Sequence, residues 1–276
     1  MSSCLSAARR SMVTLPRFEG CRIRVISMDV TGTMVSFSGT LEDHYTKAMA
    51  RCNVKGVDRS KIAPAFQKAY HDTTEKYPCF GGSKMTAKEW WRKCVLQTLE
   101  LSGSEMTDES RELVFQRVYG IFGSHDAYSA FPDAMPFLDW AQRHRMVCGV
   151  LSNADQRYGD AILPMLDLAN GMSFMCFSKD LEVQKPESAS YMALLEAARP
   201  WLPHADDPLL PSQVLHIGND FEKDFDGPTR VGMRALLLDR FDEKEVARQW
   251  RIQGAPVFKD LLDVVEYLGR NACKLG

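Results

Sequence analysis

The sequence lacks the features that mark disulfide-stabilised, membrane-spanning and nucleic-acid-binding proteins. Its eight cysteines are scattered and none belongs to a Cys-x-x-Cys pair, so we expect neither a disulfide framework nor a structural zinc site, and a reducing compartment is favoured. No apolar run approaches the ~20 residues that a membrane-spanning helix needs. The formal net charge is only −2, so neither a nucleic acid nor a membrane surface is predicted as a partner.

What the sequence does contain is the composition of an ordinary globular protein. Of its 276 residues, 45% are hydrophobic and 25% are charged, and this length suits one large core plus a smaller second module. Residues 1–20 stand apart, because they carry Arg9, Arg10 and Arg17 and no acidic residue before Glu19. We interpret them as a flexible basic segment. It is similar to a mitochondrial transit peptide, and a basic start that targets nothing fits equally well, so the predicted compartment is the cytoplasm or the mitochondrion.

Short apolar runs bounded by polar or glycine residues predict strands that are covered on both faces. These runs occupy residues 24–28, 146–151, 173–177, 214–217 and 235–238. Helical patterns lie between or after them, at residues 134–144, 187–199, 223–231 and 261–270. Strands that alternate with helices predict an α/β fold with a doubly wound parallel sheet.

One long stretch breaks this alternation. Between about residues 39 and 125 the sequence shows no strand pattern but four helical patterns, at residues 41–52, 62–77, 87–101 and 109–122. We therefore predict an all-helical insertion at residues 39–125, within a core formed by residues 21–38 and 126–276. The aromatic residues of the insertion either line the entrance to a site or pack its own small core; they include Tyr77, Phe80, Trp90 and Trp91.

Polar clusters follow four of the predicted strands. They are residues 29–33, Ser152-Asn153, Lys185-Pro186 at the start of a helix, and residues 218–224. Each cluster alone has an ordinary structural explanation: Asp29 fits a turn, Ser152-Asn153 a helix cap, and Lys185 a solvated surface charge. Because the carboxyl ends of parallel strands share one edge of a sheet, the four clusters together predict a ligand site there.

The order of these clusters resembles the haloacid dehalogenase superfamily. Its first motif, Asp-x-x-Gly-Thr, is similar to residues 29–33, and its second, a Ser or Thr after a strand, is similar to Ser152. Its third, a Lys often followed by Pro, is similar to Lys185-Pro186, and its acidic fourth motif is similar to residues 218–224. The resemblance implies a Rossmann-like hydrolase core of the superfamily's type with a helical cap.

The resemblance also implies roles for individual residues. Asp29 would be the nucleophile, which attacks phosphorus and splits hydrolysis into formation and breakdown of an aspartyl-phosphate. Thr33 would fix the turn, and Ser152 and Lys185 would bind the phosphoryl oxygens as the other catalytic groups. Gly32 and Asn153 would contact the substrate.

The predicted cofactor is Mg²⁺, which prefers oxygen ligands. The ligands implied by the resemblance are Asp29, Thr31 through its backbone carbonyl, Asn219, Asp220 and Asp224. In the fourth motif Asn219 stands where the family usually has an aspartate, which should weaken the metal site. Asp220 either supplies a carboxylate in its place or shapes the turn, and the sequence leaves both open.

A second departure concerns catalysis. Family phosphatases carry a second aspartate two residues after the nucleophile as general acid and base, and here that residue is Thr31. Loss of such a group typically costs about 10²–10⁴-fold in rate. The expected function is therefore a weak or specialised Mg²⁺-dependent phosphatase of a small phosphorylated metabolite, with a catalytically retired ligand- or partner-binding protein as the alternative.

Two further expectations remain open at this point. Hydrolysis of a carbon–halogen bond by Asp29 is chemically feasible, but it needs a cap arginine to hold the substrate, and Arg51, Arg59 and Arg92 match no pattern for that role. The sequence also leaves a homodimer open.

Overall fold

The computed structural model describes residues 16–54, 58–103, 105–202 and 208–272. At its centre lies a six-stranded sheet with the order β10-β9-β8-β3-β6-β7, in which every neighbouring pair is parallel. The strands are β3 (Val25–Met28), β6 (Val147–Ser152), β7 (Phe174–Phe177), β8 (Val214–Gly218), β9 (Arg234–Leu238) and β10 (Val257–Phe258). The predicted parallel α/β fold is confirmed, and five of these strands match the predicted runs to within one residue at each end.

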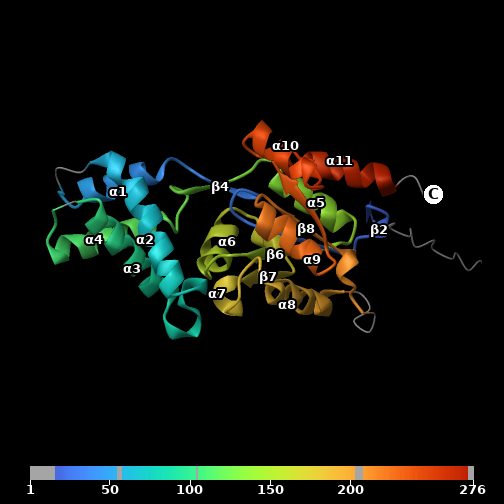
Figure 1. The fold of residues 1–276 in the computed structure, drawn as a ribbon, viewed down its shortest axis with the longest axis horizontal. Helices are drawn as coiled ribbons and strands as arrows, with labels where there is room; N and C mark the ends of the chain where they lie inside the picture. Colours follow the sequence, from blue (N-terminus) through green and yellow to red (C-terminus); the bar gives the residue numbers. More distant parts are fainter. Residues whose placement is uncertain (1–15, 55–57, 104, 203–207, 273–276) are drawn as a thin grey trace, which may run out of the picture.

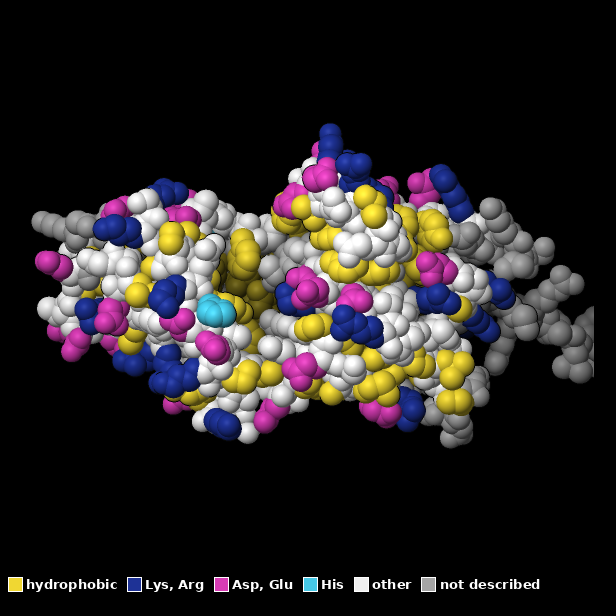
Figure 2. All heavy atoms as spheres, in the orientation of Figure 1, with side chains coloured by type: hydrophobic (Ala, Val, Ile, Leu, Met, Phe, Trp, Pro, Cys, Tyr) yellow, Lys and Arg dark blue, Asp and Glu magenta, His cyan; other side chains and the backbone are white. Residues whose placement is uncertain are grey.

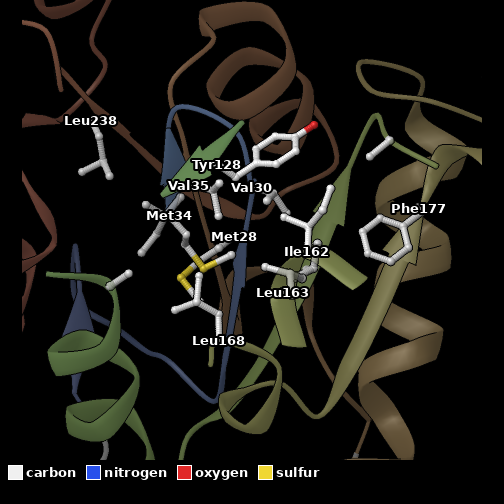
Figure 3. Packing of buried hydrophobic residues seen from close by; sticks show 14 of the residues in the cluster. Met28, Val30, Met34, Val35, Tyr128, Ile162, Leu163, Leu168, Phe177 and Leu238 are labelled. Carbon is white, nitrogen blue, oxygen red and sulfur yellow. The ribbon is translucent and has the colours of Figure 1, made fainter. Parts of the chain in front are cut away.

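Helices cover both faces of this sheet. Side chains of β3 alternate between the faces, since Ile26 packs in one hydrophobic cluster and Val25 in the other. The first cluster includes residues of α5 (Ala134–Arg143), α6 (Leu163–Met165) and α11 (Leu261–Ala272), and the second includes residues of α8 (Ser188–Ala198). Figure 3 shows part of the first cluster, in which Met28 and Val30 lie near Ile162 and Leu163.

The helical patterns of residues 39–125 form one group beside the sheet (Figure 1). Its helices are α1 (Leu41–Ala50), α2 (Ile62–Lys76), α3 (Ala87–Leu101) and α4 (Asp108–Ile121), with the 3-10 segment η2 (Cys79–Lys84) between α2 and α3. Two short strands that the sequence did not predict, β4 (Val35–Phe37) and β5 (Tyr128–Ala130), pair antiparallel where the chain enters and leaves this group. We call α1–α4 with η2 the helical insertion.

Secondary structure lies on both sides of the predicted boundary at residue 20. A small hairpin joins β1 (Arg17–Phe18) to β2 (Cys21–Arg22), and Phe18 is buried, with its ring centroid 5.6 Å from that of Tyr267 on α11. A single phenylalanine between Arg17 and Glu19 gave no strand pattern. Residues 1–15, on which most of the transit-peptide interpretation depends, lie outside the described residues.

The predicted helix at residues 223–231 is interrupted. Residues Phe221–Asp226 form the π-helical turn η7, followed by the short helix α9 (Gly227–Arg230) with Pro228 in its first turn. Three further helices were not predicted: α6 and α7 (Ser178–Leu181) are very short, and α10 (Lys244–Ile252) has a single buried residue, Ala247, so no apolar stripe identified it.

The structure also bears on the cysteines and on membrane-spanning helices. Cys21, Cys52, Cys79, Cys94, Cys148 and Cys176 are all free thiols. Within the described ranges, no helix combines the length and the apolar character needed to cross a bilayer.

Candidate active site

Asp29 directly follows β3, the strand at which the chain's progress across the sheet reverses direction. Its backbone N–H donates to the carbonyl of Ile217 on β8, 2.9 Å away, which fixes the residue between two strand ends. Its side-chain oxygen Oδ1 accepts hydrogen bonds from Ser152 Oγ and Lys185 Nζ, both at 2.9 Å. Within the described part of the chain no group donates to the other oxygen, Oδ2. The structure thus brings together three of the predicted catalytic residues.

Lys185 joins Asp29 to a second carboxylate. Its ammonium, with 1% of the side chain exposed, lies 2.6 Å from Asp224 Oδ1. Burial alone would lower the pKa of Lys185, but the charges of Asp224 and Asp29 outweigh it and raise that pKa above its ordinary value. The lysine therefore stays cationic between two carboxylates.

Asp224 is fully occupied by protein donors. Its Oδ1 also lies 3.0 Å from His216 Nε2, and its Oδ2 accepts the backbone N–H groups of Asn219 and Asp220, each at 3.0 Å. Burial would raise the pKa of Asp224, but Lys185 and His216 together lower it below its ordinary value. This arrangement does not favour the predicted role of Asp224 as a metal ligand, because both oxygens already hold the Lys185 ammonium and the turn after β8.

Ser27 and His216 form a buried hydroxyl–imidazole pair that contacts Asp224 from the interior of the sheet. Ser27 Oγ lies 2.7 Å from His216 Nδ1. Burial, together with the charge of Lys185, lowers the pKa of His216 below 6.5, so the ring is neutral at pH 7. In the tautomer that satisfies both contacts, Nε2–H donates to Asp224 and Nδ1 accepts from Ser27. The sequence gave no signal for this pairing beyond two polar residues inside buried strands.

The turn after Asp29 is built around the fourth motif. Gly32 has a φ of +82°, and a Cβ at this position would lie 2.4 Å from Asn219 Nδ2. The glycine therefore lets the Asn219 side chain lie against the turn. Thr33 is buried, and its Oγ1 donates to Asn219 Oδ1 at 3.3 Å. The first and fourth motifs are thus brought together, as predicted from their positions at neighbouring strand ends.

Asn153 holds the third motif. Its Nδ2 donates to the carbonyl of Lys185, and its Oδ1 accepts the Lys185 backbone N–H, both at 2.8 Å. Asn153 therefore positions Lys185 through its Oδ1 and one of the two N–H groups of Nδ2, and its side chain also borders the cavity described next.

A cavity of about 490 Å³ lies above this constellation. From the sheet it is lined by Asp29, Thr31, Ser152, Asn153, Ala154, Tyr158, Gln184, Lys185, Pro186, Asn219, Asp220, Lys223 and Asp224, and from the helical insertion by Tyr70, Thr74, Cys79, Phe80 and Trp90. Of the four aromatic residues for which the sequence left open a place at the entrance or in the insertion's own core, Phe80 and Trp90 border this cavity and also belong to a small buried cluster of the insertion. Figure 2 shows a hollow between the helical insertion and the sheet, with hydrophobic side chains inside it.

Buried polar contacts fix the insertion to the sheet. Trp91 Nε1 donates to Asp155 Oδ2 at 2.6 Å, and Arg157, which pairs with Asp155, lies over the rings of Trp91 and Tyr119. Trp91 therefore takes part in docking the insertion and does not border the cavity. The sequence showed neither Asp155 nor Arg157 as special, because their partners in the insertion, Trp91 in α3 and Tyr119 in α4, are far away along the chain.

A second contact lies at η2. The buried Lys179 donates through Nζ to the carbonyls of Gly82 and Met85, and Glu182 Oε1 accepts the backbone N–H of Ser83 at 3.1 Å. Both side chains belong to α7 or its end, so this short helix carries the loop that places Phe80 over the cavity.

The oxygen atoms available to a metal ion are few. Within the described residues no cluster of three or more His, Cys, Asp or Glu side chains has the arrangement of a metal site. What remains beside Asp29 Oδ2 is the Thr31 carbonyl, the Asn219 amide oxygen and the Asp220 carboxylate. Both Asp220 oxygens accept from Lys223, one from its backbone N–H at 3.0 Å and one from its ammonium at 2.6 Å.

The arginines of the helical insertion lie elsewhere. Arg59 pairs with Asp43 at 2.7 Å, and Arg92 pairs with Glu112 at 2.7 Å, with half or more of each arginine side chain exposed. Arg51 is exposed at the end of α1. None of the three borders the cavity.

Comparisons with known proteins find relatives by sequence and by fold. A family model of haloacid dehalogenase-like hydrolases matches residues 23–232. A Xenopus laevis protein named haloacid dehalogenase-like hydrolase domain-containing protein 3 is 26% identical over 220 residues, which cover 78% of this chain and 84% of that protein. The solved structure of a 2-haloacid dehalogenase from Pseudomonas syringae pv. Tomato DC3000 has a TM-score of 0.58 and 20% identity, and covers 90% of this chain and 99% of its own. The magnesium-bound putative HAD-hydrolase YfnB from Bacillus subtilis has a TM-score of 0.62 and 16% identity, with coverage of 90% and 99%.

Proposed function

This chain belongs to the haloacid dehalogenase-like hydrolase family, and we propose that it is a phosphatase that hydrolyses a small phosphorylated metabolite through an aspartyl-phosphate on Asp29. The observation that carries the proposal is the asymmetry of the Asp29 carboxylate. Ser152 and Lys185 hold Oδ1, while Oδ2 lacks a donor within the described residues and belongs to a side chain that borders the cavity. That oxygen is the one free to act as a nucleophile.

The reaction proceeds in two displacements. Asp29 Oδ2 forms a bond to phosphorus while the bond from phosphorus to the ester oxygen breaks, and the released alcohol takes its proton from water. Water then attacks phosphorus, the bond to Asp29 breaks, and inorganic phosphate and a free carboxylate result. Lys185 uses two of its three N–H groups on Asp29 and Asp224, which leaves one for a phosphoryl oxygen.

The remaining oxygen donors suit a hard divalent cation. Asp29, the Thr31 carbonyl and Asn219 would hold Mg²⁺, with Asp220 beside them, and the bound ion would neutralise charge on the phosphoryl group. With Asn219 in place of a carboxylate and Asp224 occupied, we expect weak metal binding.

Dehalogenation is less favoured. The carboxylate of a haloacid needs a cation in the cavity wall, and the three insertion arginines lie outside it. A catalytically retired, ligand-binding protein remains the second candidate, and the feature that favours it is Thr31, whose hydroxyl cannot act as an acid near neutral pH.

The test is hydrolysis of a phosphometabolite panel with Mg²⁺ by the wild type, Asp29→Asn and Thr31→Asp. We expect Asp29→Asn to lose activity by at least ~10³-fold, and Thr31→Asp to gain about 10²-fold because it supplies the missing acid. Asp126→Asn removes an exposed carboxylate and serves as the control. Absence of turnover in every variant, with no thermal stabilisation by Mg²⁺ and beryllium fluoride, would favour the retired protein instead.

A further inference from the structure

The lining of the cavity lacks a general acid for the leaving group. Thr31 Oγ1 lies 2.9 Å from the hydroxyl of Tyr158. Burial raises the pKa of Tyr70 to about 12 and raises that of the Cys79 thiol, so both are weak acids. Asp220 is an ion-paired carboxylate. The described lining contains no histidine, and its two ammonium groups, Lys185 and Lys223, are both held by carboxylates, so no described residue there is placed as a general acid near pH 7.

Without an acid, the departing oxygen must carry its negative charge. This is feasible for a weakly basic oxygen such as a phenolate, whose conjugate acid has a pKa near ~10. It is far harder for an alkoxide, whose basicity approaches that of hydroxide. The cavity therefore favours esters in which the phosphoryl oxygen is attached to an aromatic ring.

The roof of the cavity has the matching character. Tyr70 from α2, Phe80 from η2 and Trp90 from α3 border it, with the Tyr70 and Trp90 ring centroids 5.4 Å apart and those of Phe80 and Trp90 4.9 Å apart. Clustered rings from three elements of the insertion form an apolar wall against which a planar group packs well. None of these three side chains carries a charge.

The charges that border the cavity are already paired. Lys185 contacts both Asp29 and Asp224, and Lys223 contacts Asp220. Three carboxylates and two ammonium groups leave a net charge of −1, and no described residue in the lining is an unpaired cation. A second anionic group on the substrate would be buried without a partner.

We propose that the substrate is an aryl phosphate, the phosphate ester of an uncharged aromatic alcohol, held with its ring against Tyr70, Phe80 and Trp90. This inference rests on the proposed phosphatase function and narrows its substrate class.

Three matched probes test it. The first is 4-carbamoylphenyl phosphate, which is uncharged apart from its phosphate. The second, 4-carboxyphenyl phosphate, differs by a carboxylate in place of the carboxamide, and the third, 4-carbamoylbenzyl phosphate, inserts one methylene and so makes the leaving group an alkoxide. We expect kcat/KM to fall by about 10²-fold for the carboxylate and by about 10²–10⁴-fold for the benzyl ester.

Two variants should reverse these preferences separately. Thr74→Lys places a cation on the roof, at a half-buried position of α2, and should raise kcat/KM for the carboxylate relative to the carboxamide. Gln67→Lys adds the same charge at an exposed position of α2 and should leave the ratio unchanged. Thr31→Asp should narrow the gap between the phenyl and the benzyl ester, because it supplies the acid that an alkoxide needs.

Each outcome decides a separate point. Equal rates for the carboxamide and the carboxylate, or for the phenyl and the benzyl ester, would overturn the substrate class. So would failure to hydrolyse all three probes while another phosphomonoester is turned over in an Asp29-dependent reaction. Failure of every phosphomonoester, with no stabilisation by beryllium fluoride, would instead overturn the phosphatase function on which the inference rests.

Discussion

Asp224 connects the catalytic edge of the sheet to its interior. It receives Lys185 and His216 on one oxygen and the turn after β8 on the other. Gly218 makes this possible, since a Cβ there would lie 2.1 Å from the Asp224 carboxyl carbon. A carboxylate so fully bound positions the lysine that contacts Asp29. Asp224 stays charged because Lys185 and the hydrogen bond from His216 lower its pKa.

His216 should therefore make stability depend on pH. Its pKa in the folded protein lies below the ordinary 6.5, so the folded state binds fewer protons than the unfolded state. The contribution of His216 is fully present above pH 6.5 and is lost as the pH falls towards the lowered value, with a slope of up to about 1.4 kcal/mol per pH unit. We expect the free energy of unfolding, measured by denaturant titration, to decrease between pH 7 and pH 5.

The comparison variant is His216→Gln, which cannot titrate. It should be less stable than the wild type at pH 7 but should show a smaller decrease towards pH 5. His125→Gln, at an exposed position, should keep the wild-type slope. A wild-type slope in His216→Gln would show that other groups cause the pH dependence.

The sequence predicted which catalytic residues come together better than it predicted the residues that position them. Asp29 and Ser152 come directly after apolar runs and Lys185 precedes the helix that follows a third run, and parallel pairing brings such positions to one edge. The second contacts of Asn153 and Asp224 depend on rotamers and on turns that no periodicity encodes. Asn153 was predicted to contact the substrate and Asp224 to bind the metal, and in the structure both side chains contact Lys185.

Strands and helices were predictable where their pattern is local. β6 and β8 are mostly apolar runs, and α3 is preceded by Thr86, whose side chain caps the helix together with Glu89. β4 and β5 were missed because each has three residues and its partner is about ninety residues away. The segment η2 was missed because positive φ angles at Phe80, Gly81 and Gly82 give it no regular period.

We predict that η2 depends on its contacts with Lys179 of α7. In Lys179→Met the carbonyls of Gly82 and Met85 lose their buried donor, which costs ~1–3 kcal/mol where they stay unsatisfied. The segment should loosen, so hydrogen exchange of the amides at residues 80–85 should become faster and the KM for substrate should rise more than kcat falls.

Lys84→Met is the matched control, because Lys84 is exposed on the same segment. It should change neither exchange nor KM. Unaltered exchange at residues 80–85 in Lys179→Met would show that the loop is held by its own packing and not by α7.

The whole chain is tied together beneath the site by one buried arginine. Arg240, just after β9, donates to the Thr33 carbonyl in the turn after Asp29 and, at 2.6 Å, to Asp133 Oδ2 at the start of α5. The same Asp133 oxygen accepts the backbone N–H of Leu261, 2.6 Å away at the start of α11. Segments from both ends of the chain, and the point where it returns from the helical insertion, thus meet at one ion pair.

Breaking this pair should destabilise the whole molecule. In Arg240→Met the Asp133 carboxylate, 5% exposed, is left without its cation, which costs about 3–5 kcal/mol. For a protein of this size each kcal/mol lowers Tm by roughly 2–4 °C. Arg248→Met removes an arginine from an exposed pair with Glu245 and should cost less than about 1 kcal/mol.

The double variant Arg240→Met/Asp133→Leu separates charge from packing. If the cost comes from the unpaired carboxylate, removing both charges should recover most of the lost stability. The Thr33 carbonyl would still lack its donor, so activity should recover less than Tm. A double variant as unstable as Arg240→Met would mean that the guanidinium acts mainly through its packing, for instance against the ring of Phe131, 4.2 Å from its centroid.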